Sequence, residues 1–475
     1  MWNFCGQGVR LCDGVNRREV LRAGSLGFGA LGTGLSLADL LRAEAVPARP
    51  AEPAAPAPGF GKARSCIVLF LMGGPDQHST WDPKPDAPAE VRGAFGAIAS
   101  SVPGIWLSEL FPQTAQVAHR LCLLRAVSTG DHAHSSSGYY MLTGRPHQPM
   151  NFENANPGAP NDFPSVGGIV RRLAADSGGL PRSVTLPNRI FNTDGSVWPG
   201  QDAGFLGRGH DPWLIQAQPD PGGLRISEID LPDDLSPHRL QRRRSLLDQL
   251  ERSLERLTVG ETAIPWDGST KTAFELLRGS HAMGAFRLDH EPEQIRRWYG
   301  ETPFGYSVLQ ARRLIEAGVR LVQVNWYRGP DEPPQNPCWD SHTDETNRLK
   351  NVLAPPTDQA LAALIMDLEA RGMLDETLVV CMAEFGRSPR LDTSGGRNHW
   401  GSVFSVVLAG GGIRGGLVHG SSDRIGAYPR DGKVPPEDLV ATIFHCLGIH
   451  PETEIRDRLG RPVTVSRGEV IRAIL

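Results

Sequence analysis

The chain has no two cysteines in a C-x-x-C arrangement, which argues against a zinc knuckle and a thioredoxin-type redox site. Its seven cysteines are also too few for the dense framework of a small disulfide-rich secreted protein. Three of them, Cys66, Cys122 and Cys381, lie in apolar runs, where we expect them to be small buried hydrophobic residues. No thiol is therefore expected to take part in chemistry.

The chain also lacks a basic stripe with interleaved aromatic residues. Its 49 basic residues are nearly balanced by 53 acidic ones, so we do not expect nucleic acid as a partner. After the N-terminal region, no segment has the roughly 18 uninterrupted apolar residues of a membrane-spanning helix. Glycine and proline, in contrast, are numerous, with 54 and 39 residues, which is typical of many long and defined loops.

The N-terminus has the features of a twin-arginine export signal. Arg17 and Arg18 precede a weakly hydrophobic segment rich in glycine and alanine, and the sequence AEA at 43–45 offers a cleavage site between small residues. We therefore expect residues 1–45 to export the protein to the periplasm or the cell exterior. An ordinary amphipathic helix or a retained membrane anchor is the alternative. Residues 46–62, rich in proline and alanine, are expected to be a linker.

Five apolar runs have the length and composition of buried, parallel strands. They are residues 66–72, 121–127, 319–326, 377–383 and 403–410. Helical patterns at 304–318 and 358–372 each end at a glycine just before a strand. This order predicts an α/β fold for residues 63–475, with one large, mostly parallel sheet flanked by helices. Residues 176–300, which include the charged segment 236–257, are expected to form a helical insertion or cap.

Side chains that suit metal binding or catalysis lie next to every one of these runs. In an open α/β sheet the ligand site lies beyond the carboxyl ends of the strands, so such residues are expected to meet at one edge. A lone histidine or aspartate in a loop is more often a turn or cap residue, and only convergence favours a shared site. Mixed carboxylates and imidazoles suit Zn²⁺, Mn²⁺, Fe or Mg²⁺. The candidates, in chain order, are Asp76, His78, Asp131, His132, His134, Ser135, Asp340, His342, Glu384, Arg387 and His399.

The order of these motifs resembles the alkaline phosphatase and sulfatase superfamily, and within it an uncharacterised secreted bacterial family defined by a domain of unknown function. The resemblance covers roughly residues 63–420 and is carried by the first strand with GGPDQHSTWDPKP, by YYMLTGR, WDSH, AEFGR and GRNHW. It implies an alkaline-phosphatase-like core. It also implies a divalent metal cofactor, Zn or Mn, as one or two ions.

The resemblance further implies roles for individual residues. The superfamily's first-strand aspartates are replaced by Gly73 and Gly74, and the histidine after its late carboxylate is replaced by Phe385. His78, from further along the first loop, and His132 are then additional candidate ligands. The implied metal-binding set is Asp340, His342, Glu384, His399, His78 and His132.

The segment around His134 is where sulfatases carry the cysteine that becomes their nucleophile. Because no cysteine is present, a formylglycine mechanism is not expected. His134 is expected to join the metal site or bind the substrate anion, next to a helix N-terminus that also favours anions. Ser135 is either an alkoxide nucleophile or only an N-cap. Arg387 either holds a phosphate or sulfate group or forms a surface salt bridge.

These features predict a secreted, metal-dependent hydrolase of phosphate or sulfate esters. Its substrate would be a small-molecule or polysaccharide anionic ester, attacked by a metal-activated water or by Ser135. The alternative is a catalytically degenerate exported protein that binds an anionic polysaccharide or a cell-surface partner. A third hypothesis keeps a metal for structure alone.

Overall fold

In the computed structural model, the unit that contains the predicted domain begins at Pro58 and ends at Leu475. The predicted signal peptide, residues 46–56 of the predicted linker and nearly all of segment 236–257 lie outside the described residues. The described residues are 57–174, 180–220, 223–226, 239, 242, 245, 246, 249, 284–329, 332–333 and 336–475.

The folded unit begins slightly earlier than the sequence predicted. Within the expected linker, the Pro58 carbonyl accepts a hydrogen bond from His445 Nε2 at 2.8 Å, and the ring of Phe60 packs edge-on against His445. Residues 58–62 are therefore part of the domain surface. The Phe60 and His445 rings supply a contact that the proline- and alanine-rich composition did not indicate.

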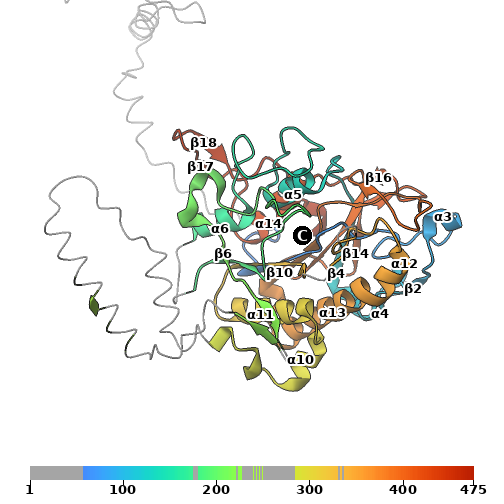
Figure 1. Ribbon diagram of the computed structural model, residues 1–475, viewed down its shortest axis with the longest axis horizontal. Coiled ribbons are helices and arrows are strands. Elements are labelled where there is room, and N and C mark those ends of the chain that lie inside the picture. Colours follow the sequence, from blue (N-terminus) through green and yellow to red (C-terminus); the bar gives the residue numbers. More distant parts are fainter. Residues whose placement is uncertain are drawn as a thin grey trace, which may run out of the picture. The chain divides into compact units, whose positions relative to one another are not determined.

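An eight-stranded sheet forms the centre of the unit, which confirms the predicted α/β fold (Figure 1). All neighbouring strands are parallel except those next to β13, which runs antiparallel to both of its neighbours. In spatial order the strands are β14 (Leu417–His419), β4 (Leu121–Val127), β13 (Phe404–Ala409), β10 (Thr377–Met382), β1 (Ser65–Phe70), β9 (Leu321–Asn325), β5 (Ser183–Leu186) and β6 (Trp213–Leu214).

The prediction that the 403–410 run is a parallel strand was wrong in direction only. A strand buried on both faces is a continuous apolar run whichever way it points, so its composition does not reveal its direction. The direction matters for the site, because the residues that precede β13 lie at the edge of the sheet where its neighbours β4 and β10 end.

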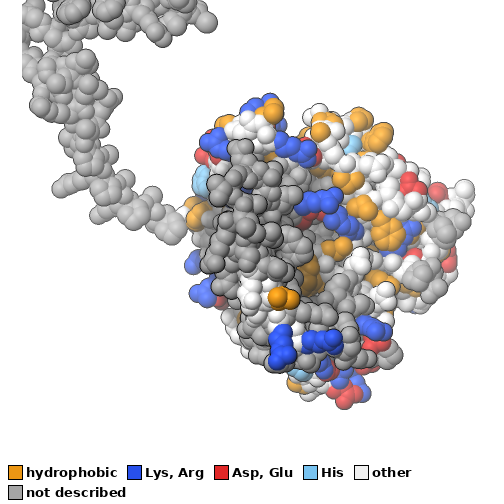
Figure 2. Space-filling view, turned by 60° about the vertical axis from the view of Figure 1, so that its left-hand side comes forward, with side chains coloured by type: hydrophobic (Ala, Val, Ile, Leu, Met, Phe, Trp, Pro, Cys, Tyr) orange, Lys and Arg blue, Asp and Glu red, His pale blue; other side chains and the backbone are white. Residues whose placement is uncertain are grey.

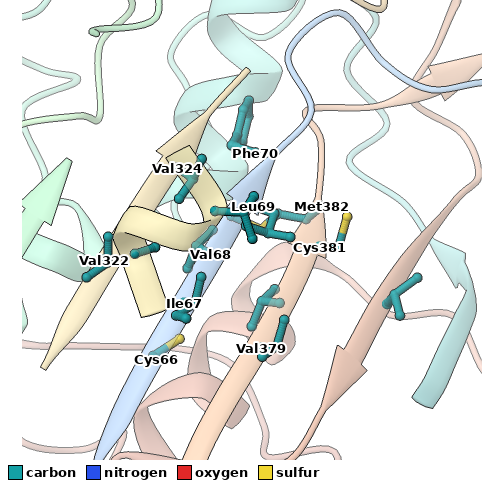
Figure 3. Close-up of a cluster of buried hydrophobic side chains, with 14 of the residues drawn as sticks. Cys66, Ile67, Val68, Leu69, Phe70, Val322, Val324, Val379, Cys381 and Met382 are labelled. Atoms are coloured by element: carbon teal, nitrogen blue, oxygen red, sulfur yellow. The ribbon is translucent and has the colours of Figure 1, made fainter. Parts of the chain in front are cut away.

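Strand β1 lies at the middle of the core, between β9 and β10 (Figure 3). All six of its residues are buried, and Leu69 is opposite Val324 on one side and Cys381 on the other.

The five cysteines of the described residues are all buried and free, which confirms that Cys66, Cys122 and Cys381 pack as small hydrophobic residues.

Helices cover both faces of the sheet (Figure 1). The two longest of the described helices, α11 and α13, confirm the predicted helical segments at 304–318 and 358–372. Helix α11 starts where the Thr302 hydroxyl accepts the N–H of Gly305, with Pro303 at its first position. One group contains α10 (Glu293–Tyr299), α11 (Pro303–Glu316) and α13 (Ala354–Ala370), and the other contains α5 (His134–Thr143), α6 (Val166–Leu173) and α14 (Pro436–Cys446).

Part of segment 176–300 belongs to the central sheet, which corrects the expectation of a helical insertion or cap. Strand β5 pairs with β9, and its Val184 and Leu186 are fully buried. Strand β6 extends the same edge. These strands have four and two residues, too short to be recognised as apolar runs.

Shorter elements, within the described residues, complete the unit. They are the helices α3 (Ala89–Arg92), α4 (Pro112–Gln116) and α12 (Glu345–Arg348), and the strand pairs β2 (Ala97–Ala99) with β3 (Trp106–Ser108), β7 (Gln218–Asp220) with β8 (Gly223–Arg225), β11 (Gly386–Arg387) with β12 (His399–Trp400), β15 (Ser421–Ser422) with β16 (Pro429–Asp431), and β17 (Glu454–Arg456) with β18 (Pro462–Thr464).

The surface has a mixed character. On the face shown in Figure 2, lysine and arginine side chains lie in several separate groups. Among the described helices, none combines the length and the apolar character required to cross a membrane.

Because Leu69 is fully buried in the central strand, we expect Leu69→Ala to lower the free energy of unfolding by about 2–5 kcal/mol. Urea-induced unfolding of the full chain measures this loss. The matched control is Leu459→Ala, since Leu459 is 77% exposed and its truncation should cost no more than about 0.5 kcal/mol. Equal effects of the two substitutions would contradict the placement of β1 in the core.

Candidate metal centre

Five of the predicted residues meet at one edge of the sheet. The loop after β4 supplies His134, the loop after β9 supplies Asp340 and His342, and the loop after β10 supplies Glu384. His399 comes from the loop before β13, which reaches the same edge because β13 is antiparallel. The predicted convergence is therefore present.

The Asp340 carboxylate lies at the centre of this cluster. Its Oδ1 is 2.9 Å from His342 Nε2 and 3.2 Å from His399 Nε2, and the two Nε2 atoms are 2.9 Å apart. Its Oδ2 is 3.3 Å from His134 Nε2. One carboxylate thus faces three imidazole rings.

Glu384 contacts this cluster through His134. Its Oε1 accepts the backbone N–H of Gly73 at 2.8 Å and lies 2.7 Å from His134 Nδ1. A carboxylate on Nδ1 fixes the ring so that Nε2 faces Asp340, which is the usual arrangement behind a metal-binding histidine. Glu384 Oε2 is buried and has no hydrogen-bond partner among the described residues. Glu384 therefore orients His134 through Oε1, and its Oε2 is left for another partner.

His399 is held in a similar way. Its Nδ1 donates to the backbone carbonyl of His132 at 2.9 Å. The lone pair of Nε2 therefore faces Asp340 and His342. Its ring stacks on Phe385 with centroids 4.7 Å apart. The strand pair β11 and β12 places His399 opposite Arg387. These contacts fix both the position and the tautomer of the ring.

Arg387 forms a buried ion pair with Asp340. Its side chain is fully buried, with Nη2 2.5 Å from Asp340 Oδ1 and Nε donating to the Gly74 carbonyl at 2.9 Å. It also donates to the carbonyls of Gly73, Trp339 and Arg397. The structure therefore does not bring Arg387 to a substrate, nor to a surface salt bridge. A guanidinium saturated with backbone partners positions a loop and neutralises a carboxylate.

Gly73 and Gly74 allow the loops to approach one another closely. A Cβ on Gly73 would lie 2.3 Å from Asp340 N, and a Cβ on Gly74 would lie 2.6 Å from the Phe385 ring. Both glycines have positive φ angles, of 110° and 81°. Phe385, which stands where the resemblance implied a polar ligand for a second ion, packs its ring against His134 and His399. The described residues therefore fit one ion better than two.

The charges in the cluster settle its protonation. Burial alone would lower the pKa of His134, but Asp340 and Glu384 raise it to about 10. Burial and the neighbouring His134 lower the pKa of His399 to about 3. Burial would raise the pKa of Asp340, but Arg387 and His134 bring it well below its usual range. Near neutral pH and without an ion, His134 carries the proton and His399 is neutral.

The donor set fits a divalent ion. Ligand atoms about 2.0–2.2 Å from one tetrahedral ion are about 3.3–3.6 Å apart, slightly more than the 2.9 to 3.2 Å separations among Asp340, His342 and His399. Ligand atoms of His134, Asp340 and His399 also lie within 4.8 Å of one another. A carboxylate with imidazoles suits Zn²⁺ or Mn²⁺. The spare oxygen of Glu384 is a further potential ligand.

Two of the predicted ligands lie elsewhere or act indirectly. His78 is buried and satisfied, with Nδ1 2.7 Å from Asp76 and Nε2 2.8 Å from the Ile425 carbonyl. His132 accepts the N–H of Gly401 at its Nδ1, and it supports the site only through its carbonyl. His78 is structural because loop partners occupy both of its ring nitrogens, whereas the His132 ring bonds to the backbone of the 399–401 segment through Nδ1.

The structure also corrects the expectations for Ser135 and the helix N-terminus. Ser135 is fully buried, donates to the Phe152 carbonyl and accepts the N–H of Ala155, so it faces away from the cluster. It is not the N-cap either, because α5 begins at His134 and follows Ala133. The N–H of His134 donates to Glu153 at 2.7 Å, so a carboxylate occupies the expected anion-binding position.

A cavity of about 510 Å³ opens next to the cluster. His134, Asp340 and His399 form part of its wall, and Glu153, Trp198 and Arg328 form other parts. The last three were not among the residues predicted from the sequence. Arg328 lies three residues after the end of β9, a position that strand ends indicate, whereas Glu153 and Trp198 lie in long loops that give no comparable signal.

A family model described as "Protein of unknown function (DUF1501)" matches residues 63–475. The chain belongs to the DUF1501 family. This confirms the expectation of a family defined by a domain of unknown function. No curated protein is significantly similar in sequence.

Several solved structures are similar to this DUF1501 member. Ps i-CgsB is 13% identical, with 81% of this chain and 72% of that chain covered and a TM-score of 0.40. The PsFucS1 sulfatase from Pseudoalteromonas sp. is 13% identical, with 82% and 68% covered and a TM-score of 0.36. The phosphonate monoester hydrolase SpPMH from Silicibacter pomeroyi is 13% identical, with 86% and 76% covered and a TM-score of 0.38.

The raised pKa of His134 leads to a pH-dependent metal affinity. An ion can bind Nε2 only after the ring loses a proton, and with a pKa of about 10 each unit of rising pH increases the neutral fraction. We expect the apparent affinity for Zn²⁺ to increase about tenfold per pH unit between about pH 6 and 8. Competition titrations of the metal-free protein measure this slope.

Two variants make this titration specific. His134→Gln should weaken binding and flatten the slope, whereas His450→Gln should behave as wild type because that ring is exposed. A wild-type affinity that does not change with pH would contradict the assignment of His134 as a ligand.

Proposed function

We propose that this DUF1501 member is an exported, metal-dependent hydrolase of phosphate or sulfate esters. The observation that carries the proposal is the cluster of Asp340 with three imidazoles at the wall of a substrate-sized cavity. Cavities of about 300–1,000 Å³ are typical of small-molecule sites. Asp340, His342, His399 and His134 would hold the ion.

A divalent ion held there would supply Lewis acidity toward an oxygen of the ester group. The chain's own residues prepare that site. Arg387 neutralises Asp340 and fixes its loop, while Glu384 and the His132 carbonyl set the tautomers of His134 and His399. Glu153 places a carboxylate on the cavity wall, and burial raises its pKa, which suits a group that receives or returns a proton.

Water is the nucleophile that this geometry favours. Ser135, the sequence candidate, is buried and bonded to the 152–155 loop. Among the described residues that line the cavity, Thr193 is the only one with a hydroxyl side chain, and it contacts Arg328. We therefore propose direct attack by water without a covalent enzyme intermediate.

We further propose that the predicted twin-arginine signal, residues 1–45, exports the protein. Arg17 and Arg18 and the weakly hydrophobic segment after them support this proposal. Folding before export suits a protein with a metal centre, since the ion can be bound before transport.

The second candidate function is a binding protein without catalysis. Two observations favour it: Phe385 fills the place of a polar ligand, and Glu153 occupies the helix terminus that was expected to bind an anion. In this case the cavity would bind an anionic polysaccharide or a cell-surface partner without hydrolysing it.

Turnover of aryl phosphates and aryl sulfates by the metal-loaded protein tests the proposal. We expect Asp340→Asn to lower kcat/KM by at least about 100-fold, because it removes the charge that a cation requires. We expect Ser135→Ala to retain turnover, although it removes two buried hydrogen bonds and so lowers stability by about 1–3 kcal/mol.

Loss of turnover in a folded Ser135→Ala variant would contradict the water mechanism. If the loaded wild-type protein hydrolyses none of these esters but still binds a sulfated oligosaccharide, the binding protein is the better account. Circular dichroism and thermal unfolding check that each variant is folded.

A further inference from the structure

Arg328 contributes a cation to the wall of the same cavity. It follows β9 and lines the cavity together with the 191–194 loop and the metal cluster. It is the only lysine or arginine among the described lining residues, which also include the carboxylates of Glu153, Asp194 and Asp340. The role proposed for the metal centre does not use it.

The guanidinium of Arg328 is fixed in place. Nη1 donates to the Phe191 carbonyl at 3.0 Å, Nη2 donates to Thr193 Oγ1 at 3.2 Å, and the group lies over the Phe191 ring at 5.0 Å. These contacts use two of the five N–H donors of an arginine. A purely structural role in joining two loops accounts for the two bonds but not for the remaining donors.

No carboxylate of the described residues pairs with Arg328, although three line the cavity. Asp340 is bound to Arg387 and the imidazoles, Glu153 accepts from His134, and Asp194 accepts from Ser196. A partly buried guanidinium that has no carboxylate partner within the described part of the chain offers a preformed site for a carboxylate, sulfate or phosphate group.

We propose that Arg328 forms a second subsite, which binds an anionic group on the alcohol part of the substrate. This inference rests on the proposed function and names its substrate class: phosphate or sulfate esters of acidic saccharides. The side chains of Asn154 and Thr193 lie on the same wall and offer partners for sugar hydroxyls, and the rings of Phe191 and Trp198 offer apolar surface for a sugar face. The ester group would lie at the metal cluster and the acidic group at Arg328.

The subsite can be tested without turnover, using disaccharides that contain no ester. The probes are cellobiose and its counterpart with glucuronic acid in place of the non-reducing glucose, and calorimetry measures their binding to the metal-loaded protein. We expect the acidic disaccharide to bind at least about tenfold more tightly than cellobiose, because a hydrogen bond between charged groups contributes that much binding free energy. Arg328→Gln should abolish this preference, and Arg328→Lys should retain part of it, since lysine keeps the charge without the planar fork.

Arg390→Gln is the matched control, because Arg390 is exposed and pairs with Glu90 at 2.9 Å. It should keep the wild-type preference. Thermal unfolding of each variant checks that the loss of the Arg328 contacts to the 191–194 loop has not disrupted the fold.

Equal binding of the two disaccharides by the wild-type protein would overturn the subsite, as would a preference that survives in folded Arg328→Gln. The proposed hydrolase activity can fail while the subsite holds. That is the result if the metal-loaded protein hydrolyses no phosphate or sulfate ester but keeps the Arg328-dependent preference. The two proposals are therefore distinguishable.

Discussion

The site depends on the contact between the Asp340 carboxylate and the buried Arg387 guanidinium. A buried carboxylate is costly unless it is paired, and Arg387 pairs with it while its other donors bond to the carbonyls of Gly73, Gly74, Trp339 and Arg397. This one side chain thereby ties together the loops after β1, β9 and β10 and the loop before β13. His342 and His399 can approach Asp340 only because these loops are held at short range, and His134 faces the same carboxylate from the N-terminus of α5.

The same contact shapes the electrostatics of the centre. Arg387 and the protonated His134 keep Asp340 ionised, while His399 stays neutral. An incoming divalent ion would replace the His134 proton, so the charge of the buried cluster changes less than it would if a bare carboxylate received the ion. Glu384 and the His132 carbonyl act on the other side of the rings, where each fixes a tautomer.

The parts of the fold that were predictable from the sequence are those with long apolar or amphipathic patterns. β1, β9, β10 and β13 are continuous buried runs, and β4 is interrupted only by the half-buried Arg125. A glycine follows the end of both α11 and α13, and α11 also has a capping threonine. Strands β5, β6 and β14 were missed because two to four residues give no period to detect. The direction of β13 was also hidden, because burial on both faces removes the alternation of a strand.

For the site, strand ends indicated which residues converge but not where their side chains point. Asp340, His342 and His399 face one another as expected. Glu384 reaches the cluster through His134, and Ser135, His78 and Arg387 each bond to at least one backbone carbonyl outside their own loop. Such partners follow from tertiary packing, and one sequence does not specify them. Gly73 and Gly74 were informative for a different reason: they mark the place where the Asp340 loop and the Phe385 ring come too close for any side chain.

The measurement that tests the central claim most directly is the metal content of the protein, purified without chelator and analysed by elemental mass spectrometry. The account expects about one equivalent of a divalent transition metal, because Phe385 and the two glycines leave room for one ligand set. An Asp340→Ala variant should bind almost none. A folded wild-type protein that carries no metal and acquires none from Zn²⁺, Mn²⁺ or Fe²⁺ would contradict the account.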